Sequence, residues 1–282
     1  MARVATIDFH VTSECSQECV YCWGPQGIDP VDTEVAERII ARIAVSAERI
    51  VFTGGDPMQR DDIGRLVSYA AGCGLEVALS TTGDQLTAAF LEEHGPEVGL
   101  VSLPLDGASE EVSARTKEEG HFGAVMAALD LLAAYPGIDV KVATPVTRHN
   151  LTDVPNIVAL LSDRAAAMPN RLFYNVFQVF PRSFDPEVPW DDLVVGDDEF
   201  AALRSDVERL RPPFTINWLS HETLDKLYVM VFPDGTLTVP VGPTFRSFGP
   251  FLAVEDLEDS LERTDFDAPK HRRHAAGWAK RS

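Results

Sequence analysis

The segment ATIDFHVTSECSQECVYCWGP, residues 5–25, joins a strand-like run to three closely spaced cysteines. Cys15, Cys19 and Cys22 follow the first strand directly. Their C-x3-C-x2-C spacing differs from the paired C-x2-C knuckles of tetrahedral zinc sites and leaves a fourth ligand unaccounted for. Three cysteine thiolates suit a [4Fe–4S] cluster whose remaining iron stays open to another ligand. The alternative is an incomplete zinc site that His10 or a distant residue completes.

The composition limits the class of protein. The chain has 282 residues, 45% of them hydrophobic, which is enough for a sizeable core. A formal net charge of −20 works against binding to nucleic acid, because the phosphate backbone requires a basic surface. Clustered cysteines fit metal binding in a reducing compartment better than a disulfide framework. The fourth cysteine, Cys73, ends a predicted helix, and we expect it to pack in the core.

The hydropathy pattern contains no membrane span. The first strand begins within a few residues of Met1, and no run approaches the roughly 18 apolar residues that cross a bilayer. We therefore expect a soluble, cytoplasmic protein without nucleic-acid or membrane partners.

Short β-rich runs alternate with helical stretches along the first two thirds of the chain. Such alternation implies parallel strand pairing with right-handed crossovers, and thus an α/β fold with a curved sheet or partial barrel. In these folds the chemistry sits at the carboxyl ends of the strands. The predicted strands are 5–11, 49–53, 76–81, 100–106, 139–147 and 171–180, and the predicted helices are 33–46, 61–74, 122–135 and 156–166.

The pattern changes near residue 181. A Pro-rich connection leads to a helix at 196–210 and to the hairpin LYVMVFPDGTLTVP, residues 227–240, with DG at its turn. We therefore divide the chain into a barrel core, 1–181, and a C-terminal extension, 182–282, whose helix, hairpin and tail are expected to cover the active site.

The cysteine segment resembles the signature of the radical S-adenosylmethionine (SAM) superfamily, C-x3-C-x-aromatic-C, with Tyr21 as the aromatic residue. The resemblance implies a partial (β/α)6 parallel barrel of the radical SAM type with a C-terminal extension. It also implies two cofactors, a [4Fe–4S] cluster held by the three cysteines and SAM chelated to the free iron. One-electron cleavage of SAM would then give methionine and a 5′-deoxyadenosyl radical that takes hydrogen from a substrate.

Further segments extend this resemblance. TGGDP, residues 53–57, is similar to the Gly-Gly-Glu-Pro loop that binds the methionyl ammonium of SAM in the family. STTG, residues 80–83, is similar to the family's ribose-binding strand. The SAM-binding residues implied are Tyr21, Gly54, Gly55, Asp56, Pro57, Ser80, Thr82 and Phe177.

The C-terminal half resembles viperin-like enzymes, in which viperin dehydrates the ribose of a nucleoside triphosphate. VFQVF, LYVMVFPDGTLTVP and AVEDLEDSLERTDFD occur in the corresponding order. Viperin-like enzymes carry two basic residues before VFQ, where this chain has Phe173 and Asn175, and their basic loop after the hairpin retains only Arg246 here. The substrate residues implied are Arg49, Lys141, Tyr174, Asn175 and Tyr228.

The sequence therefore predicts a radical SAM enzyme that abstracts hydrogen from a small metabolite, such as a nucleoside or a sugar, and not from a nucleoside triphosphate. An electron donor such as flavodoxin or ferredoxin is expected as a partner. The alternatives are modification of a peptide or protein and a non-catalytic iron–sulfur scaffold. No residue is predicted as catalytic, and the fate of the substrate radical is open.

Overall fold

The computed structural model describes residues 3–183, 185, 187–264 and 266–276. Its strands form one sheet in the order β10-β9-β8-β1-β2-β3-β4-β5-β6-β7. The strands are β1 (Val4–Thr12), β2 (Ala47–Gly54), β3 (Glu76–Ser80), β4 (Val98–Pro104), β5 (Asp139–Val146), β6 (Leu172–Gln178), β7 (Thr215–Leu219), β8 (Met230–Val231), β9 (Thr236–Val241) and β10 (Thr244–Pro250). The helices are α1 (Thr33–Ser46), α2 (Ile63–Gly72), α3 (Ala88–His94), α4 (Glu110–Ser113), α5 (His121–Leu132), α6 (Val154–Ala167), α7 (Trp190–Leu193), α8 (Asp197–Arg209), α9 (His221–Leu224), α10 (Leu257–Glu262) and α11 (Ala268–Ala276).

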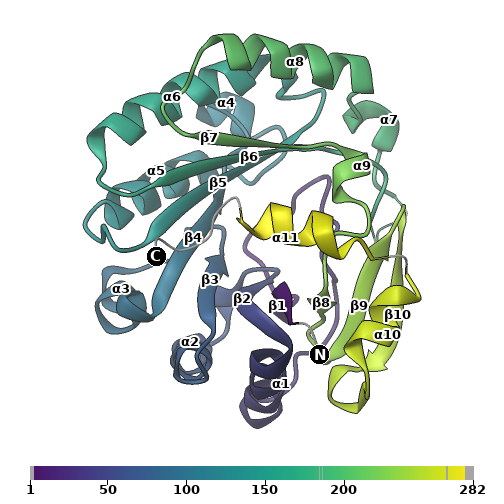
Figure 1. The fold of residues 1–282 in the computed structure, drawn as a ribbon. Helices are drawn as coiled ribbons and strands as arrows, with labels where there is room; N and C mark the ends of the chain where they lie inside the picture. The colour runs from purple at the N-terminus through teal and green to yellow at the C-terminus, as the bar shows by residue number, and fades with distance from the viewer. Residues whose placement is uncertain (1–2, 184, 186, 265, 277–282) are drawn as a thin grey trace.

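The predicted parallel architecture is confirmed. Neighbouring strands from β1 to β7 pair in parallel, β8 joins β1 in parallel, and β9 and β10 add an antiparallel edge. The sheet curves without closing, with β10 at one end and β7 at the other, so it is a partial barrel (Figure 1). Parallel pairing places the carboxyl ends of β1 to β7 on one side of the molecule.

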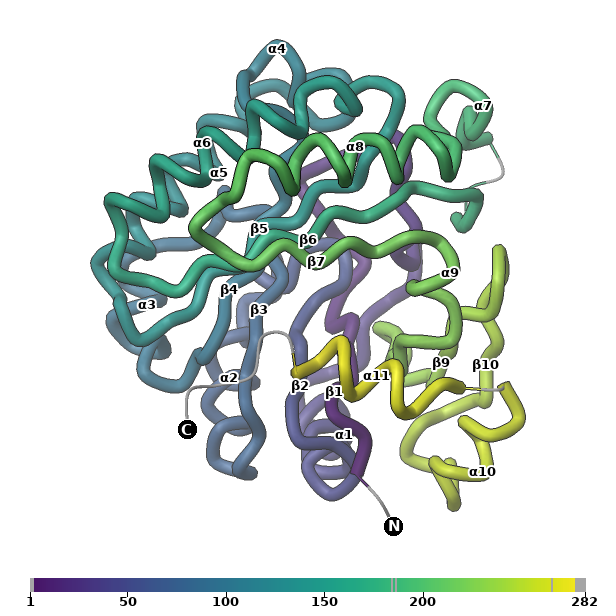
Figure 2. The backbone as a smooth tube through the Cα atoms, turned by 45° about the horizontal axis from the view of Figure 1, so that its top comes forward, coloured from purple at the N-terminus to yellow at the C-terminus, as the bar shows by residue number. Residues whose placement is uncertain are grey.

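Helices cover the convex side of the sheet (Figures 1 and 2). In α1, Ile39 and Ile43 are buried against the sheet, as their helical spacing predicts. The Asp32 side chain caps this helix by accepting a hydrogen bond from the Val35 amide. Gly74 adopts a φ of 81° after α2, the left-handed conformation for which glycine is favoured after a helix.

The C-terminal extension supplies the strands at both ends of the sheet, β7 at one end and β8 to β10 at the other. The predicted hairpin is confirmed as β8 and β9, with Gly235 at a φ of 82° in its turn. Helix α11 lies at the amino ends of β1 and β2 (Figure 2). There the Thr6 amide donates to His271 Nε2 at 3.1 Å, and Arg49 Nη1 donates to the Ala275 carbonyl at 3.3 Å.

Two features depart from the sequence prediction. Strand β7 was not predicted, because its five residues have partly buried side chains and carry no clear alternation. The prediction that Cys73 packs in the core is wrong, since Cys73 is exposed at the end of α2.

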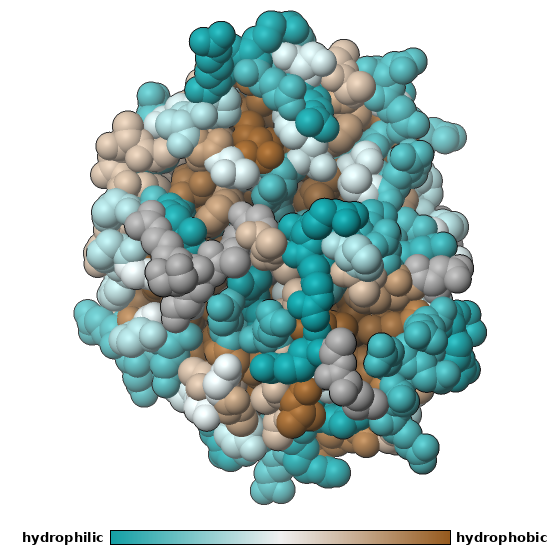
Figure 3. Space-filling view, viewed as in Figure 1, coloured by the Kyte–Doolittle hydropathy of each residue, from teal (hydrophilic) through white to brown (hydrophobic). Residues whose placement is uncertain are grey.

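Hydrophilic residues cover most of the face shown in Figure 3. Within the described ranges, every helix is too short or too polar to span a bilayer.

Candidate active site

A cavity of about 970 Å³ occupies the concave side of the sheet. The cysteine loop after β1 lines one end of it, at the carboxyl ends of the strands, and His271 and His274 of α11 line it at the amino ends. The described part of the C-terminal tail therefore lines the end of the cavity opposite the cysteines.

All three clustered cysteines line this cavity, and none forms a disulfide. Lys117 Nζ donates to Cys19 Sγ at 2.9 Å. Burial raises the pKa of the Cys19 thiol, and Lys117 partly offsets this effect. In the described part of the chain, no three His, Cys, Asp or Glu side chains are already arranged around a common metal position. Three free thiols beside a lysine, on the wall of one cavity, fit an iron–sulfur cluster.

The Gly-Gly loop packs directly against the cysteine loop. The Gly55 amide donates to the Thr12 carbonyl at 2.9 Å, and the Asp56 amide donates to the Glu14 carbonyl at 2.7 Å. A Cβ on Gly54 would lie 2.1 Å from the Thr12 carbonyl oxygen, and one on Gly55 would lie 2.1 Å from that of Glu14. Only glycine permits this approach, so the two motifs depend on each other sterically.

Most of the predicted SAM-binding residues line the cavity, but two do not. Asp56 is fully buried and accepts hydrogen bonds from the Thr82 hydroxyl at 2.5 Å and from the Met58 amide at 3.0 Å. Asp56 therefore fastens the Gly-Gly loop to the end of β3, and Pro57 begins the short helix that follows. The residues that line the cavity are Tyr21, Gly54, Gly55, Ser80, Thr82 and Phe177.

Tyr21 has a partner that the sequence prediction missed. Its hydroxyl donates to the carboxylate of Asp106, which is fully buried and also accepts a hydrogen bond from Thr116 at 2.6 Å. The Lys117 ammonium lies 5.4 Å from the centre of the Tyr21 ring. Asp106 and Lys117 both follow β4, so the loop after this strand orients the aromatic residue of the cysteine motif.

The predicted substrate residues divide into two groups. Lys141, Asn175 and Tyr228 line the cavity. Arg49 does not line the cavity, since its side chain forms a salt bridge with Glu76 at 2.5 Å near the amino end of β2. Tyr174 points toward the helices, where its hydroxyl donates to Thr144 Oγ1 at 2.8 Å, because successive residues of β6 face opposite sides of the sheet.

Lys141 faces an anion that the sequence prediction did not identify. Asp8 of β1 lines the same cavity and interacts electrostatically with Lys141 of β5. Burial raises the pKa of Asp8 and lowers the pKa of Lys141, while each opposite charge partly offsets the effect on the other. The alternation of apolar and polar residues in β1 could have indicated that Asp8 faces the cavity, but not that Lys141 is its partner.

Two further buried groups have unused polar atoms on this wall. His10 Nδ1 and Asn175 Nδ2 have no hydrogen-bond partner among the described residues. Burial lowers the pKa of His10 to about 4, so its ring is neutral at physiological pH. The Asn175 amide oxygen is already occupied by a hydrogen bond from Asn217 at 2.8 Å. These atoms can bind polar groups of a substrate.

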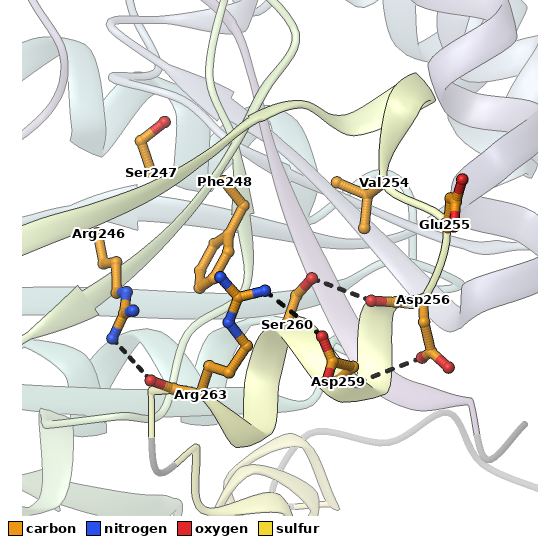
Figure 4. A pocket seen from close by; sticks show the side chains of 9 residues that line it. All are labelled: Arg246, Ser247, Phe248, Val254, Glu255, Asp256, Asp259, Ser260 and Arg263. Carbon is orange, nitrogen blue, oxygen red and sulfur yellow. Dashed lines mark hydrogen bonds and ion pairs between the residues drawn. The ribbon is translucent and has the colours of Figure 1, made fainter.

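A second hollow, of about 500 Å³, lies on the C-terminal extension (Figure 4). Arg246 borders it and donates a hydrogen bond to the Arg263 carbonyl at 2.7 Å. The two hollows share no lining residue among those described. Arg246, the one basic residue left in the loop after the hairpin, therefore does not face the cavity.

Comparison with known proteins supports the family. A model described as the Radical SAM superfamily matches residues 9–161. An S-adenosylmethionine-dependent nucleotide dehydratase from Lacinutrix mariniflava is 24% identical over 290 residues, which cover 96% of this chain and 57% of that protein. The mycofactocin maturase MftC of Mycobacterium ulcerans is 32% identical over 168 residues, which cover 57% of this chain and 45% of that protein. The chain thus spans about half the length of these two relatives.

The fold has a solved counterpart. The structure of anSMEcpe with bound AdoMet superposes with a TM-score of 0.70 at 13% identity, covering 96% of this chain and 82% of that one. The chain belongs to the radical SAM superfamily, whose members use a [4Fe–4S] cluster and SAM, and its similarity to the nucleotide dehydratase is consistent with the viperin-like branch.

Proposed function

We propose that this protein is a radical SAM enzyme that abstracts hydrogen from a small metabolite other than a nucleoside triphosphate. The observation that carries the proposal is the charge balance of the cavity. The described lysines and arginines that line it are Lys117, Lys141 and Arg182. Asp and Glu residues outnumber them, since Asp8, Glu18, Asp185 and Glu187 line the same cavity.

Two of these three cations already interact with an acidic side chain of the protein, and the third, Arg182, has a carboxylate nearby. Lys117 donates to Cys19 Sγ at 2.9 Å, Lys141 interacts with Asp8, and Arg182 Nη2 lies 3.8 Å from Asp225 Oδ1. Triphosphate recognition draws on several charge-assisted hydrogen bonds, each worth about 1.5–3 kcal/mol. A triphosphate would therefore meet few available cations and several carboxylates.

The roles of the residues follow from their positions. Cys15, Cys19 and Cys22 would hold the cluster, and Gly54 and Gly55 would bring the backbone of the Gly-Gly loop against SAM. When bound, the cluster and SAM supply the 5′-deoxyadenosyl radical that takes hydrogen from the substrate. The cavity walls exclude water and position the reacting carbon. The electron comes from a reductant, for which flavodoxin or ferredoxin is the proposed partner.

Peptide modification is a second candidate. It is supported by the similarity to the mycofactocin maturase and by the net charge of −20, which would attract a basic peptide. The position of α11 at the end of the cavity favours a small molecule, because His271 and Ala275 tie this helix to β1 and β2.

The test measures 5′-deoxyadenosine by mass spectrometry after anaerobic cluster reconstitution and addition of dithionite and SAM, with and without cytidine triphosphate. We expect 5′-deoxyadenosine at a rate that the nucleotide does not increase. Strong stimulation would contradict the charge argument. No 5′-deoxyadenosine under either condition would contradict the enzyme assignment and favour the iron–sulfur scaffold.

A further inference from the structure

Arg182 is a buried cation whose hydrogen-bonding capacity is largely unused. Its side chain is 4% exposed and lines the cavity, in the loop that follows β6. Of its five N–H donors, only the one on Nε makes a hydrogen bond within the described residues, to the Gly242 carbonyl at 2.8 Å. Nη2 is fully buried without a hydrogen-bond partner there. An arginine in this state costs free energy unless a ligand completes its bonding.

The nearest carboxylate does not complete it. Asp225 Oδ1 lies 3.8 Å from Arg182 Nη2, beyond hydrogen-bonding distance. The same oxygen accepts a hydrogen bond from the Gly242 amide at 2.7 Å. Asp225 therefore offsets the charge of the guanidinium without occupying its donors.

Two aromatic rings fix the orientation of the guanidinium. Its carbon lies 4.5 Å from the centre of the Phe180 ring and 5.7 Å from that of Trp23. Trp23 stacks in turn on Phe245 at 5.9 Å with an interplanar angle of 10°. Contacts with aromatic rings engage the faces of a guanidinium, whereas its N–H groups project from the edge. A planar edge of this kind binds one carboxylate or one phosphate in a bidentate manner.

The position of Arg182 points to the substrate and not to SAM. Except for Phe177 of β6, the predicted SAM residues lie on the cysteine loop and at the carboxyl ends of β2 and β3. The Arg182 side chain instead contacts Gly242 and Asp225 of the C-terminal extension, on the opposite side of β1. The next residue, Ser183, donates to the Cys22 carbonyl at 2.7 Å, so this loop is also anchored beside the proposed cluster.

We propose that Arg182, held by Trp23 and Phe180, binds the single anionic group of the substrate, a carboxylate or a phosphate. This inference rests on the proposed function and narrows its substrate to metabolites with one such group at the end that faces the cysteine loop. The restriction to a single anionic group is supported by the acidic residues nearby. Glu18, Asp185 and Glu187 line the same cavity and repel a second or third negative charge.

The first experiment measures binding without turnover. Inorganic phosphate and sodium acetate are titrated separately into the cluster-loaded, SAM-saturated protein under anaerobic conditions, and tryptophan fluorescence is recorded. We expect one of the two anions to give a saturable change that disappears in Trp23→Phe. In Arg182→Gln the same anion should bind about tenfold more weakly or worse, in line with the loss of a charge-assisted bidentate contact.

Two variants serve as controls. Arg182→Lys keeps the charge but loses the planar fork, so its affinity should fall between those of the wild type and Arg182→Gln. Arg246→Gln removes an arginine of the surface hollow and should bind the anion as the wild type does (Figure 4). Failure of both anions to bind the wild type, or equal affinity in Arg182→Gln, would overturn the proposal.

A further measurement separates substrate from cofactor. The KM for SAM in substrate-free 5′-deoxyadenosine formation should be the same in Arg182→Gln and in the wild type. A tenfold increase would make Arg182 a residue of the SAM site and refute the proposal. Because anion binding is read without catalysis, its outcome stays distinct from failure of the proposed enzyme activity.

Discussion

The two ends of the cavity are built in different ways. At the carboxyl ends of the strands, the cysteine loop and the Gly-Gly loop are short contiguous segments that meet through backbone hydrogen bonds such as Gly55 N to Thr12 O. At the other end and along the side wall, single residues converge from distant parts of the chain. Asp8 with Lys141 is one example, and the Thr6 amide with His271 Nε2 of α11 is another. The first kind of site identifies cofactor chemistry, and the second determines what else can bind.

The largest effect is expected for a substitution in the cysteine loop. Cys19→Ala should lose the cluster and all SAM cleavage, because three thiolates are the proposed protein ligands of the cluster. Iron content and the visible absorption of the reconstituted protein report this loss independently of activity. Cys73→Ala is the matched control, since Cys73 is exposed at the end of α2. Normal iron content and activity in Cys19→Ala would show that the cluster assignment is wrong.

The second-largest effect is expected for Asp8 and Lys141, two cavity residues from distant strands. Lys141→Met leaves the buried Asp8 carboxylate without the nearby cation that partly offsets its burial, so the variant should be less stable whenever this carboxylate is charged. Burial already raises the pKa of Asp8, and the substitution should raise it further. The folded variant then binds a proton that the unfolded chain releases near pH 4, so stability falls as pH rises toward and through the folded pKa.

Thermal midpoints recorded between pH 6 and pH 9 test this expected fall of stability with rising pH. Lys141→Met should lose stability relative to the wild type as the pH increases, by up to about 1.4 kcal/mol per unit. The double variant Asp8→Asn, Lys141→Met should lose this pH dependence, because it contains no buried carboxylate at that position. A difference between wild type and Lys141→Met that is independent of pH would exclude the pairing.

The smallest effect tests the contact between the two motifs. Gly55→Ala places a Cβ 2.1 Å from the Glu14 carbonyl oxygen, and such overpacking costs about 1–3 kcal/mol. We expect a lower thermal midpoint and a higher KM for SAM. Gly123→Ala, in the first turn of α5 with nothing within 4 Å of the added Cβ, should stabilise by up to about 0.5–1 kcal/mol. Equal midpoints in the two variants would show that the loops can move apart.

Much of the fold could be predicted from local patterns. The alternation of strands and helices indicated the parallel sheet, and DG indicated the hairpin whose strands are β8 and β9. Strand β7 was not predicted because its short, partly buried sequence has no period-2 alternation of apolar and polar residues. Cys73 was misplaced because residue type favours burial for cysteine, whereas its position at the end of α2 exposes it.

The sequence by itself determined the cofactor end of this protein, because ligands within one short loop need no other part of the chain to be recognised. It also shows Lys141 within an apolar strand, where a lysine is costly unless it meets an anion or water. Only the tertiary structure decided which anion that is, turned Tyr174 away from the cavity and left Arg182 with unused donors inside it. The reason is geometric: pairing across a curved sheet depends on strand order and register, which residues far apart in the chain do not encode locally.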